Sequence, residues 1–181
     1  MRTVLGLGLM FLLASAAAAD EPPGPPPAKP LGIDLSLRLG PSIPGGANIV
    51  TSEPMFPLWL GLGYRIDGLW YVGVSGAYAF GSTICQGCTP SYNVQFLVEA
   101  AAHPLRYAKV DPWIGLGVGG EWFHDGYLNP SGWIPVTIEL GVDFALARSF
   151  RAGPFYAFQL VVTGSSTHTW NVVGLQLTGL P

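Results

Sequence analysis

Two cysteines, Cys85 and Cys88, stand three positions apart in the segment Cys-Gln-Gly-Cys. In an exported protein, a pair at this spacing is typical of one disulfide, which here would staple a loop. Catalytic redox chemistry would need a thioredoxin-like βαβ setting, and a zinc ion would need two further ligands nearby. The sequence around the pair offers neither, so we expect a disulfide and no metal site.

A second set of residues has the types that a hydrolase uses. Ser166 and His168 lie two positions apart, and Glu121, His124 and Asp125 add a histidine and two carboxylates. A nucleophile and its base must meet within hydrogen-bond reach, which the sequence does not show. Serine and histidine are also ordinary loop residues. We therefore expect no enzymatic activity and keep a lipid-modifying hydrolase as an alternative.

Charged residues are rare, at 10 % of the chain, with 8 Lys+Arg against 11 Asp+Glu. An average soluble domain carries roughly 25 %, and so few basic residues leave no positive surface for nucleic acid. Hydrophobic residues make up 49 % of the chain, which excludes intrinsic disorder. The low charge content must therefore have its explanation in the structural elements that carry these residues.

Apolar residues alternate with small or polar ones at every second position along eight segments, which is the period of a β-strand. In the segment 56–66, for example, Leu58 and Leu60 alternate with Trp59 and Gly61. When Leu, Ile and Val set the phase of each strand, every charged residue in the strands falls on the opposite face. The strands are expected at 31–40, 56–66, 69–80, 93–103, 112–122, 133–145, 151–162 and 170–180.

The charge-free face carries nearly all of the branched bulk, whereas the other face is crowded with Gly, Ala and Ser. A soluble sandwich would turn its bulky face inward, but small residues suit a cramped barrel interior and large ones suit lipid. Strands of ~9–11 residues match the thickness of the bilayer. In a closed barrel every backbone donor and acceptor within the hydrocarbon layer can pair. The pattern predicts an all-β fold, a closed eight-stranded antiparallel up-and-down transmembrane β-barrel with its apolar face outward.

The ionisable residues of the strands would then point into the lumen. Three are basic and five are acidic, and His103 is able to adjust the balance. Asp34 and Arg65 lie near the periplasmic ends of neighbouring strands and could form an ion pair. The full set is Asp34, Arg38, Arg65, Glu99, His103, Glu121, Glu139, Asp143 and Arg151.

Two interpretations of this lumen remain open. The side chains could form a hydrogen-bonded polar network that fills the interior and fixes the barrel. Alternatively, the excess of acidic residues could favour cations along a narrow water-filled path. The inward glycines could leave room for that path, or for the rings of Trp59, Tyr71, Trp113 and Phe155.

The connections between strands alternate in length, as do the short periplasmic turns and longer extracellular loops of outer-membrane barrels. Asp67-Gly68 is a two-residue hairpin turn of a strongly favoured type, and both chain termini would lie in the periplasm. The short connections are 67–68, 104–111 and 146–150, and the long ones are 41–55, 81–92, 123–132 and 163–169. The first three long segments are the candidate surface for an extracellular ligand.

The N-terminal segment predicts export. Arg2 precedes the apolar run 4–13, and an Ala-rich stretch ends in an Ala-x-Ala pattern at Ala19. These are the parts of a cleaved secretory signal peptide. The next segment is rich in proline, which favours an extended spacer. The chain is thus divided into 1–19 signal peptide, 20–30 proline-rich periplasmic linker and 31–181 barrel.

The signal peptide, the eight alternating strands and the unequal loops resemble the small outer-membrane β-barrel proteins of Gram-negative bacteria, such as the OmpA membrane domain, OmpX and OmpW. The resemblance is one of pattern over residues 31–180, and it departs from the family at the non-aromatic end Gly179-Leu180-Pro181. It implies a monomer in the cell outer membrane, in contact with outer-membrane lipid. A structural or surface-interaction role is expected, with no cofactor and no nucleic-acid partner.

Two other roles are carried as alternatives. The first is a porin-like narrow channel for small ions or apolar solutes. The second is the outer-membrane lipid hydrolase, because some small barrels are enzymes that act on lipid A.

Overall fold

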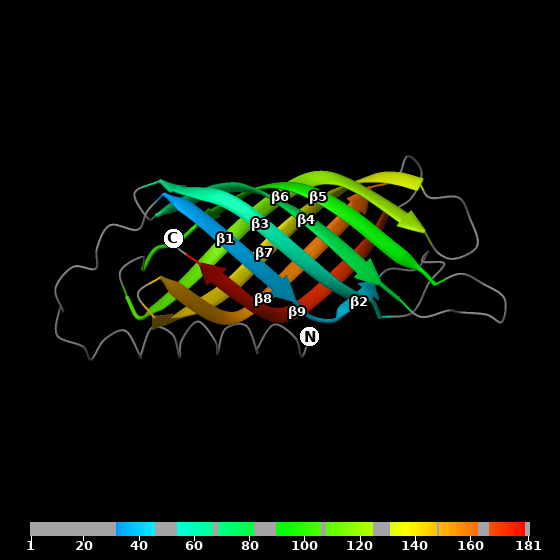
Figure 1. Cartoon of the computed structure of the whole chain (residues 1–181). Coiled ribbons are helices and arrows are strands. Elements are labelled where there is room, and N and C mark those ends of the chain that lie inside the picture. The colour runs from blue at the N-terminus through cyan, green and yellow to red at the C-terminus, as the bar shows by residue number, and fades with distance from the viewer. Residues whose placement is uncertain are drawn as a thin grey trace, which may run out of the picture.

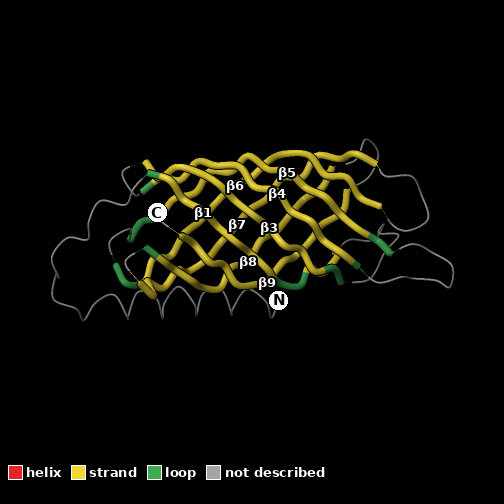
Figure 2. Tube along the Cα trace, viewed as in Figure 1, coloured by secondary structure: helices red, strands yellow, loops and turns green. Residues whose placement is uncertain are grey.

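A computed structural model describes residues 32–45, 54–66, 69–81, 90–105, 108–124, 131–147, 149–162 and 167–179. These residues contain strands and loops and no helix (Figure 2), so none of them forms a helix long and apolar enough to cross a membrane. The strands are β1 (Ile33–Leu39), β2 (Ser42–Gly45), β3 (Phe56–Ile66), β4 (Trp70–Phe80), β5 (Tyr92–Ala102), β6 (Val110–His124), β7 (Ser131–Ala147), β8 (Phe150–Val162) and β9 (Thr167–Gly179).

The strands form one closed antiparallel sheet. From β3 to β9 each strand pairs with the next, and β9 returns to pair with both β1 and β2. Leu39 of β1 pairs with Leu175, and Ser42 of β2 pairs with Val172, so β1 and β2 are two parts of one barrel strand in a single register. The predicted closed eight-stranded barrel is confirmed, and its strands run obliquely around the long axis (Figure 1).

The interruption between β1 and β2 corrects the prediction that 41–55 is entirely loop. Pro41 has no backbone N–H to donate to the ladder. At Gly40 a Cβ atom would lie 2.1 Å from the carbonyl oxygen of Val173, so the backbones approach too closely for a side chain. The strand resumes after these two residues, and Ser42 exchanges backbone hydrogen bonds with Met55.

Other predicted boundaries shift by a few residues. The segment 163–169 is not all loop, because Thr167–Thr169 pair with Leu160–Val162 of β8. The segment 123–132 is shortened from both sides by β6 and β7, and Asp111 lies in β6 and not in a turn. The predicted signal peptide, linker, Asp67-Gly68 turn and Cys85–Cys88 pair lie outside the described residues, so they stay predictions.

The two faces of the barrel wall follow the predicted phase. In β3 the burial alternates residue by residue, with Leu60 63 % exposed on the outside and Trp59 3 % exposed on the inside. Two clusters of buried apolar residues fill parts of the lumen, one around Trp59 and Trp113 and one around Met55 and Trp170. The bulky apolar face therefore points away from the barrel interior.

Rings mark one end of the outward face. Phe56 pairs with Phe80, Phe80 with Tyr92, and Tyr92 with His124, so four ring-bearing residues form a row across β3–β6. The outward rings of Tyr64 and Trp70 lie at the opposite ends of β3 and β4. An 11-residue strand such as β4, tilted as in membrane barrels, rises roughly 25 Å, which is the height of an apolar membrane band.

Candidate functional site: the barrel lumen

The structure brings the predicted ionisable residues into the barrel interior in three layers. Strand alternation places them there, because each lies in the inward phase of its strand, and His103 directly follows β5 in the same phase. Asp34, Arg38, Arg65, Glu99, His103, Glu121, Glu139 and Asp143 are buried, and Arg151 is half-buried.

Arg38 occupies the middle layer and bridges two carboxylates from other strands. One guanidinium nitrogen lies 3.0 Å from Glu99 Oε2 and the other 2.9 Å from Glu139 Oε2. Arg38 Nε donates to Gln176 Oε1 at 2.8 Å, and the Ser75 hydroxyl donates to Glu99. The layer therefore ties together β1, β4, β5, β7 and β9 across the lumen, and every guanidinium nitrogen has an acceptor.

The layer near Ile66 and Trp70, at one end of the barrel, is centred on Asp111. Its Oδ2 atom lies 3.7 Å from Arg65 Nη1, 3.0 Å from His103 Nδ1 and 3.3 Å from Arg151 Nη1. Arg65 also pairs with Asp34 through its Nε, as the sequence had suggested. Sequence reasoning missed Asp111 because it assigned the residue to a turn. The phase of β6 would have found it, since Asp111 precedes the inward Trp113 by two.

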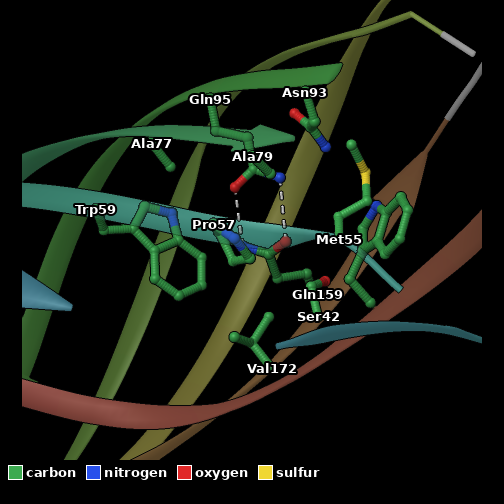
Figure 3. A pocket seen from close by; sticks show the side chains of 11 residues that line it. Ser42, Met55, Pro57, Trp59, Ala77, Ala79, Asn93, Gln95, Gln159 and Val172 are labelled. Carbon is green, nitrogen blue, oxygen red and sulfur yellow. Dashed lines mark hydrogen bonds between the residues drawn. The ribbon is translucent and has the colours of Figure 1, made fainter. Parts of the chain in front are cut away.

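Neutral amides dominate the layer at the opposite end. Glu121, which is fully buried, accepts a hydrogen bond from Asn93 Nδ2 at 2.8 Å and one from Gln95 Nε2 at 3.0 Å. Gln95 and Gln159 exchange two hydrogen bonds across the lumen (Figure 3). A search for charged residues misses these amides, although they lie in the same inward phase. No described Lys or Arg forms a salt bridge with Glu121; the His168 ring lies nearby, with its Nε2 3.8 Å from Glu121 Oε1.

An aromatic group covers this amide layer. Phe123 stacks on Trp133 with ring centroids 5.5 Å apart, and it also contacts Trp170 at 6.0 Å. The His168 ring meets Trp133 edge-on at 4.7 Å. Met55 packs in the same cluster. Apolar side chains therefore occupy the described lumen beyond the amide layer.

The inward glycines make room for aromatic rings. A Cβ atom at Gly63 would lie 2.3 Å from the Tyr71 ring, and one at Gly141 would lie 2.4 Å from the Trp113 indole. At Gly174 a Cβ atom would come within 2.7 Å of the Phe155 ring. These are contacts that Cβ atoms do not make, so at these positions the space left by glycine is already occupied.

The residues considered for hydrolysis are described only in part. Glu121 and His168 come together in the lumen, with His168 Nε2 3.8 Å from Glu121 Oε1, beyond hydrogen-bond distance. His124 lies in the outward phase of β6 and packs on Tyr92 with centroids 5.0 Å apart. His168 lies in β9 and is not a loop residue, which corrects its predicted position. Ser166 and Asp125 lie outside the described residues.

The described residues contain no group of three or more His, Cys, Asp or Glu side chains arranged to hold a metal ion. Many polar atoms of the lumen are instead paired with one another, in ion pairs and amide hydrogen bonds. The arrangement can therefore stabilise and close a barrel, and it can present a ladder of carboxylates along the axis.

No protein-family model matches the chain, and no curated protein matches its sequence significantly. Solved structures do match. Neisserial surface protein A (NspA) superimposes with a TM-score of 0.66 at 13 % identity, over 83 % of this chain and 97 % of that one. The fold is that of the small outer-membrane β-barrels. Sequence identity this low shows the fold alone.

Two further outer-membrane barrels have the same architecture. The N-terminal β-barrel domain of Pseudomonas aeruginosa OprF gives a TM-score of 0.51 at 8 % identity, covering 80 % of this chain and 96 % of that one. The outer-membrane enzyme PagL gives 0.52 at 13 % identity, covering 82 % and 99 %. Because outer-membrane barrels of this architecture include an enzyme, the barrel by itself does not assign an activity.

Proposed function

We propose that the chain is exported, spans the outer membrane and acts there as a structural or surface-interaction barrel whose lumen is closed by its own polar network. The observation that carries the proposal is Arg38, which bridges Glu99 and Glu139 across the lumen. The Asp111 layer lies on one side of this bridge, and the Glu121 amide layer lies on the other. Side chains from every barrel strand meet in these layers, as in a filled eight-stranded barrel.

The proposed location rests on the outward face. Its exposed residues in the described strands are apolar except for Thr167 at the start of β9, and they include Ile33, Leu60 and Leu175. Rings stand near both ends of β3 and β4, as in the aromatic girdles at the two interfaces of membrane barrels. The barrel fold and the predicted signal peptide fit the same location, where outer-membrane lipid would surround the wall.

Planar-bilayer recording on the refolded protein tests the closed lumen. Because the Arg38 layer and the aromatic group cross the axis, we expect no sustained conductance above that of a protein-free detergent control. Reproducible conductance steps that disappear in Glu99→Gln and Glu139→Gln would contradict the closed-lumen proposal. Those steps would support the second candidate, a narrow channel that favours cations.

The channel candidate rests on a specific observation. The described lumen holds three arginines against six carboxylates, namely Asp34, Glu99, Asp111, Glu121, Glu139 and Asp143. An excess of carboxylates along a pore attracts cations and repels anions. Conduction through the lumen would require the Arg38 layer to open. A preference for cations in any measured conductance would distinguish this pore from a leak around the barrel.

A deletion strain separates a structural role from a surface-interaction role. If the barrel stabilises the outer membrane, loss of the protein is expected to raise sensitivity to detergents. Wild-type protein would restore resistance, and so would a variant in which Gly-Ser segments of equal length replace residues 82–89 and 125–130. If only the wild type restores the phenotype, the loops carry the role and an extracellular ligand is implied.

A further inference from the structure

The outward face of β9 begins with three polar residues. Thr167, Thr169 and Asn171 occupy successive outward positions of this strand, and the next outward positions, from Val173 to Leu177, are apolar. Among the described strands, β9 is the one in which three successive outward positions are polar. The polar residues therefore form a track that starts at one end of the wall and runs inward along the outer surface.

A hydrogen bond and a glycine join this track to the two neighbouring strands, β8 and β2, which lie beside β9 in the wall (Figure 1). Asn171 Oδ1 accepts a hydrogen bond from Tyr156 Oη of β8 at 2.7 Å. Gly45 of β2 pairs with Thr169, and a Cβ atom at Gly45 would lie 2.6 Å from Thr169 Oγ1 and 3.3 Å from Asn171 Nδ2. The Thr169 hydroxyl and the Asn171 amide nitrogen therefore converge over the glycine. We call these four residues the polar array.

The polar array places hydrogen-bond donors on a wall that otherwise carries apolar side chains. The Asn171 oxygen already accepts from Tyr156, so the nitrogen, with its two N–H groups, is the end of the amide that lies toward Gly45. Asn171 and Thr169 are half-buried, so both also meet the surroundings of the barrel. Hydrocarbon offers no acceptor to such groups, and polar side chains inside a membrane are typical of functional sites.

The depth and the charge of this region indicate what the acceptor is. Asn171 lies four residues after Thr167 in β9, so in a tilted strand it lies roughly 10 Å from the end of the wall. This is near the boundary between headgroups and acyl chains, where the carbonyl groups of lipid linkages lie. The segments 41–55 and 163–169, which continue the wall at this end, contain no Lys or Arg for an anionic headgroup. An uncharged carbonyl therefore fits the array better than a phosphate.

We propose that the polar array binds an acyl lipid of the surrounding membrane through a carbonyl oxygen of its ester or amide linkage, which accepts a hydrogen bond from Asn171 Nδ2. The acyl chain lies along the apolar outward positions of β9, from Val173 to Leu177. A side chain at Gly45 would collide with Thr169 Oγ1, so the glycine keeps the two polar groups uncovered. The inference rests on the proposed membrane location and adds a specific lipid site to it.

Nuclear magnetic resonance in lipid nanodiscs tests the lipid site. Discs of dimyristoyl phosphatidylcholine offer ester carbonyls, whereas discs of its dialkyl ether analogue have the same headgroup and chain length and no carbonyl. With ¹⁵N-labelled asparagine, Asn171→Leu identifies the side-chain amide signals of Asn171. These signals are expected to move between the two kinds of disc, and Thr169→Val is expected to reduce that displacement.

An amide introduced elsewhere on the wall supplies the matched control. Ile134 is an exposed outward residue of β7 near the same end, and it pairs with the apolar Val162. The amide of Ile134→Asn lacks the neighbours of Asn171, so its signals are expected to move less. An equal displacement would show that any exposed amide responds to lipid carbonyls, and it would overturn the site.

Two other results would also overturn the site. One is an Asn171 signal that is the same in both kinds of disc. The other is a signal that follows the ratio of protein to lipid and not the linkage, which would place a second copy of the chain on this face. A wild-type protein that inserts into neither disc would instead contradict the proposed membrane location, so the two failures are distinguishable.

Discussion

Arg38 of β1 and Glu99 of β5 form an ion pair across the barrel, with Nη2 and Oε2 3.0 Å apart. The two strands are not neighbours in the sheet, because β3 and β4 lie between them on one side. The contact therefore braces opposite parts of the wall, which backbone pairing alone does not do. Glu139 of β7 completes the brace from a third direction.

Replacing Arg38 is expected to be strongly destabilising. Arg38→Met leaves Glu99 and Glu139 buried without their cation, which costs about 3–5 kcal/mol for a buried pair. Equilibrium unfolding in urea from lipid vesicles, followed by tryptophan fluorescence, measures the change. Arg151→Met is the control and is expected to cost less, because Arg151 is only half-buried.

The same brace can be removed as a whole. Arg38→Met combined with Glu99→Gln and Glu139→Gln leaves no buried charge in the layer, so most of the lost stability should return. If the triple variant is no more stable than Arg38→Met, the loss does not come from unpaired carboxylates, and the role assigned to the layer is wrong.

The fit between glycine and indole in the lumen is tested at Gly141. Gly141→Ala places a Cβ atom against the Trp113 ring, where the distance would be 2.4 Å, and overpacking of this kind costs about 1–3 kcal/mol. Gly76→Ala is the matched control, because its Cβ atom would have no neighbour closer than 3.9 Å. Equal effects of the two substitutions on the free energy of unfolding would contradict the packing argument.

The depth of the wall in the membrane is tested with arginine. Leu60 lies in the middle of β3 and is 63 % exposed on the outward face, so Leu60→Arg is expected to cost about 2–4 kcal/mol at the bilayer midplane. Ile66→Arg, at the end of the same strand, is expected to cost about 1 kcal/mol or less. A protein that stays monomeric in water without detergent, with no difference between these variants, would refute the membrane orientation.

Export is tested at the N-terminus of the protein isolated from cell envelopes. Signal-peptide cleavage after the Ala-x-Ala pattern should leave Asp20 as the first residue, which N-terminal sequencing identifies directly. A chain that still begins at Met1 in the envelope would show that residues 1–19 act as an anchor.

The predicted Cys85–Cys88 disulfide is tested by thiol alkylation of the exported protein. Both cysteines should resist alkylation until a reductant is added, because an oxidising compartment keeps such pairs closed. Cytoplasmic expression of the same chain without residues 1–19 provides the reduced control. Alkylation of the untreated exported protein would rule the disulfide out.

Which residues of each strand face outward could be predicted from the sequence, because the outward face of each strand carries apolar residues and no charge. Leu60 and Trp59 show why composition alone misleads: both are apolar, yet only their positions relative to Arg65 and Gly61 in the same strand tell which one faces the lumen. Boundaries could not be predicted as well. Thr167 and Ser42 are polar residues typical of loops, and only pairing with β8 and β9 makes them strand.

The interior was harder to predict than the wall. Charged residues could be collected by type, but which of them pair depends on the height of each strand in the closed sheet. The contact between Arg38 and Glu139 joins residues 101 positions apart, and no local pattern encodes it. Asn93 and Gln159 were not predicted as site residues because an amide carries no charge, although both form hydrogen bonds inside the lumen.

The junction of β1 and β2 with β9 gives the barrel a preferred order of assembly. It joins the first and last described strands of the chain, so it requires the largest loop closure of any pairing in the sheet. Gly40 and Pro41 also interrupt it. Every other pairing is between strands that follow one another along the chain, and each can form as a hairpin. We therefore expect the ring to close last and, because the seam is interrupted, to open first, so that hydrogen exchange begins along this seam before it reaches β6 and β7.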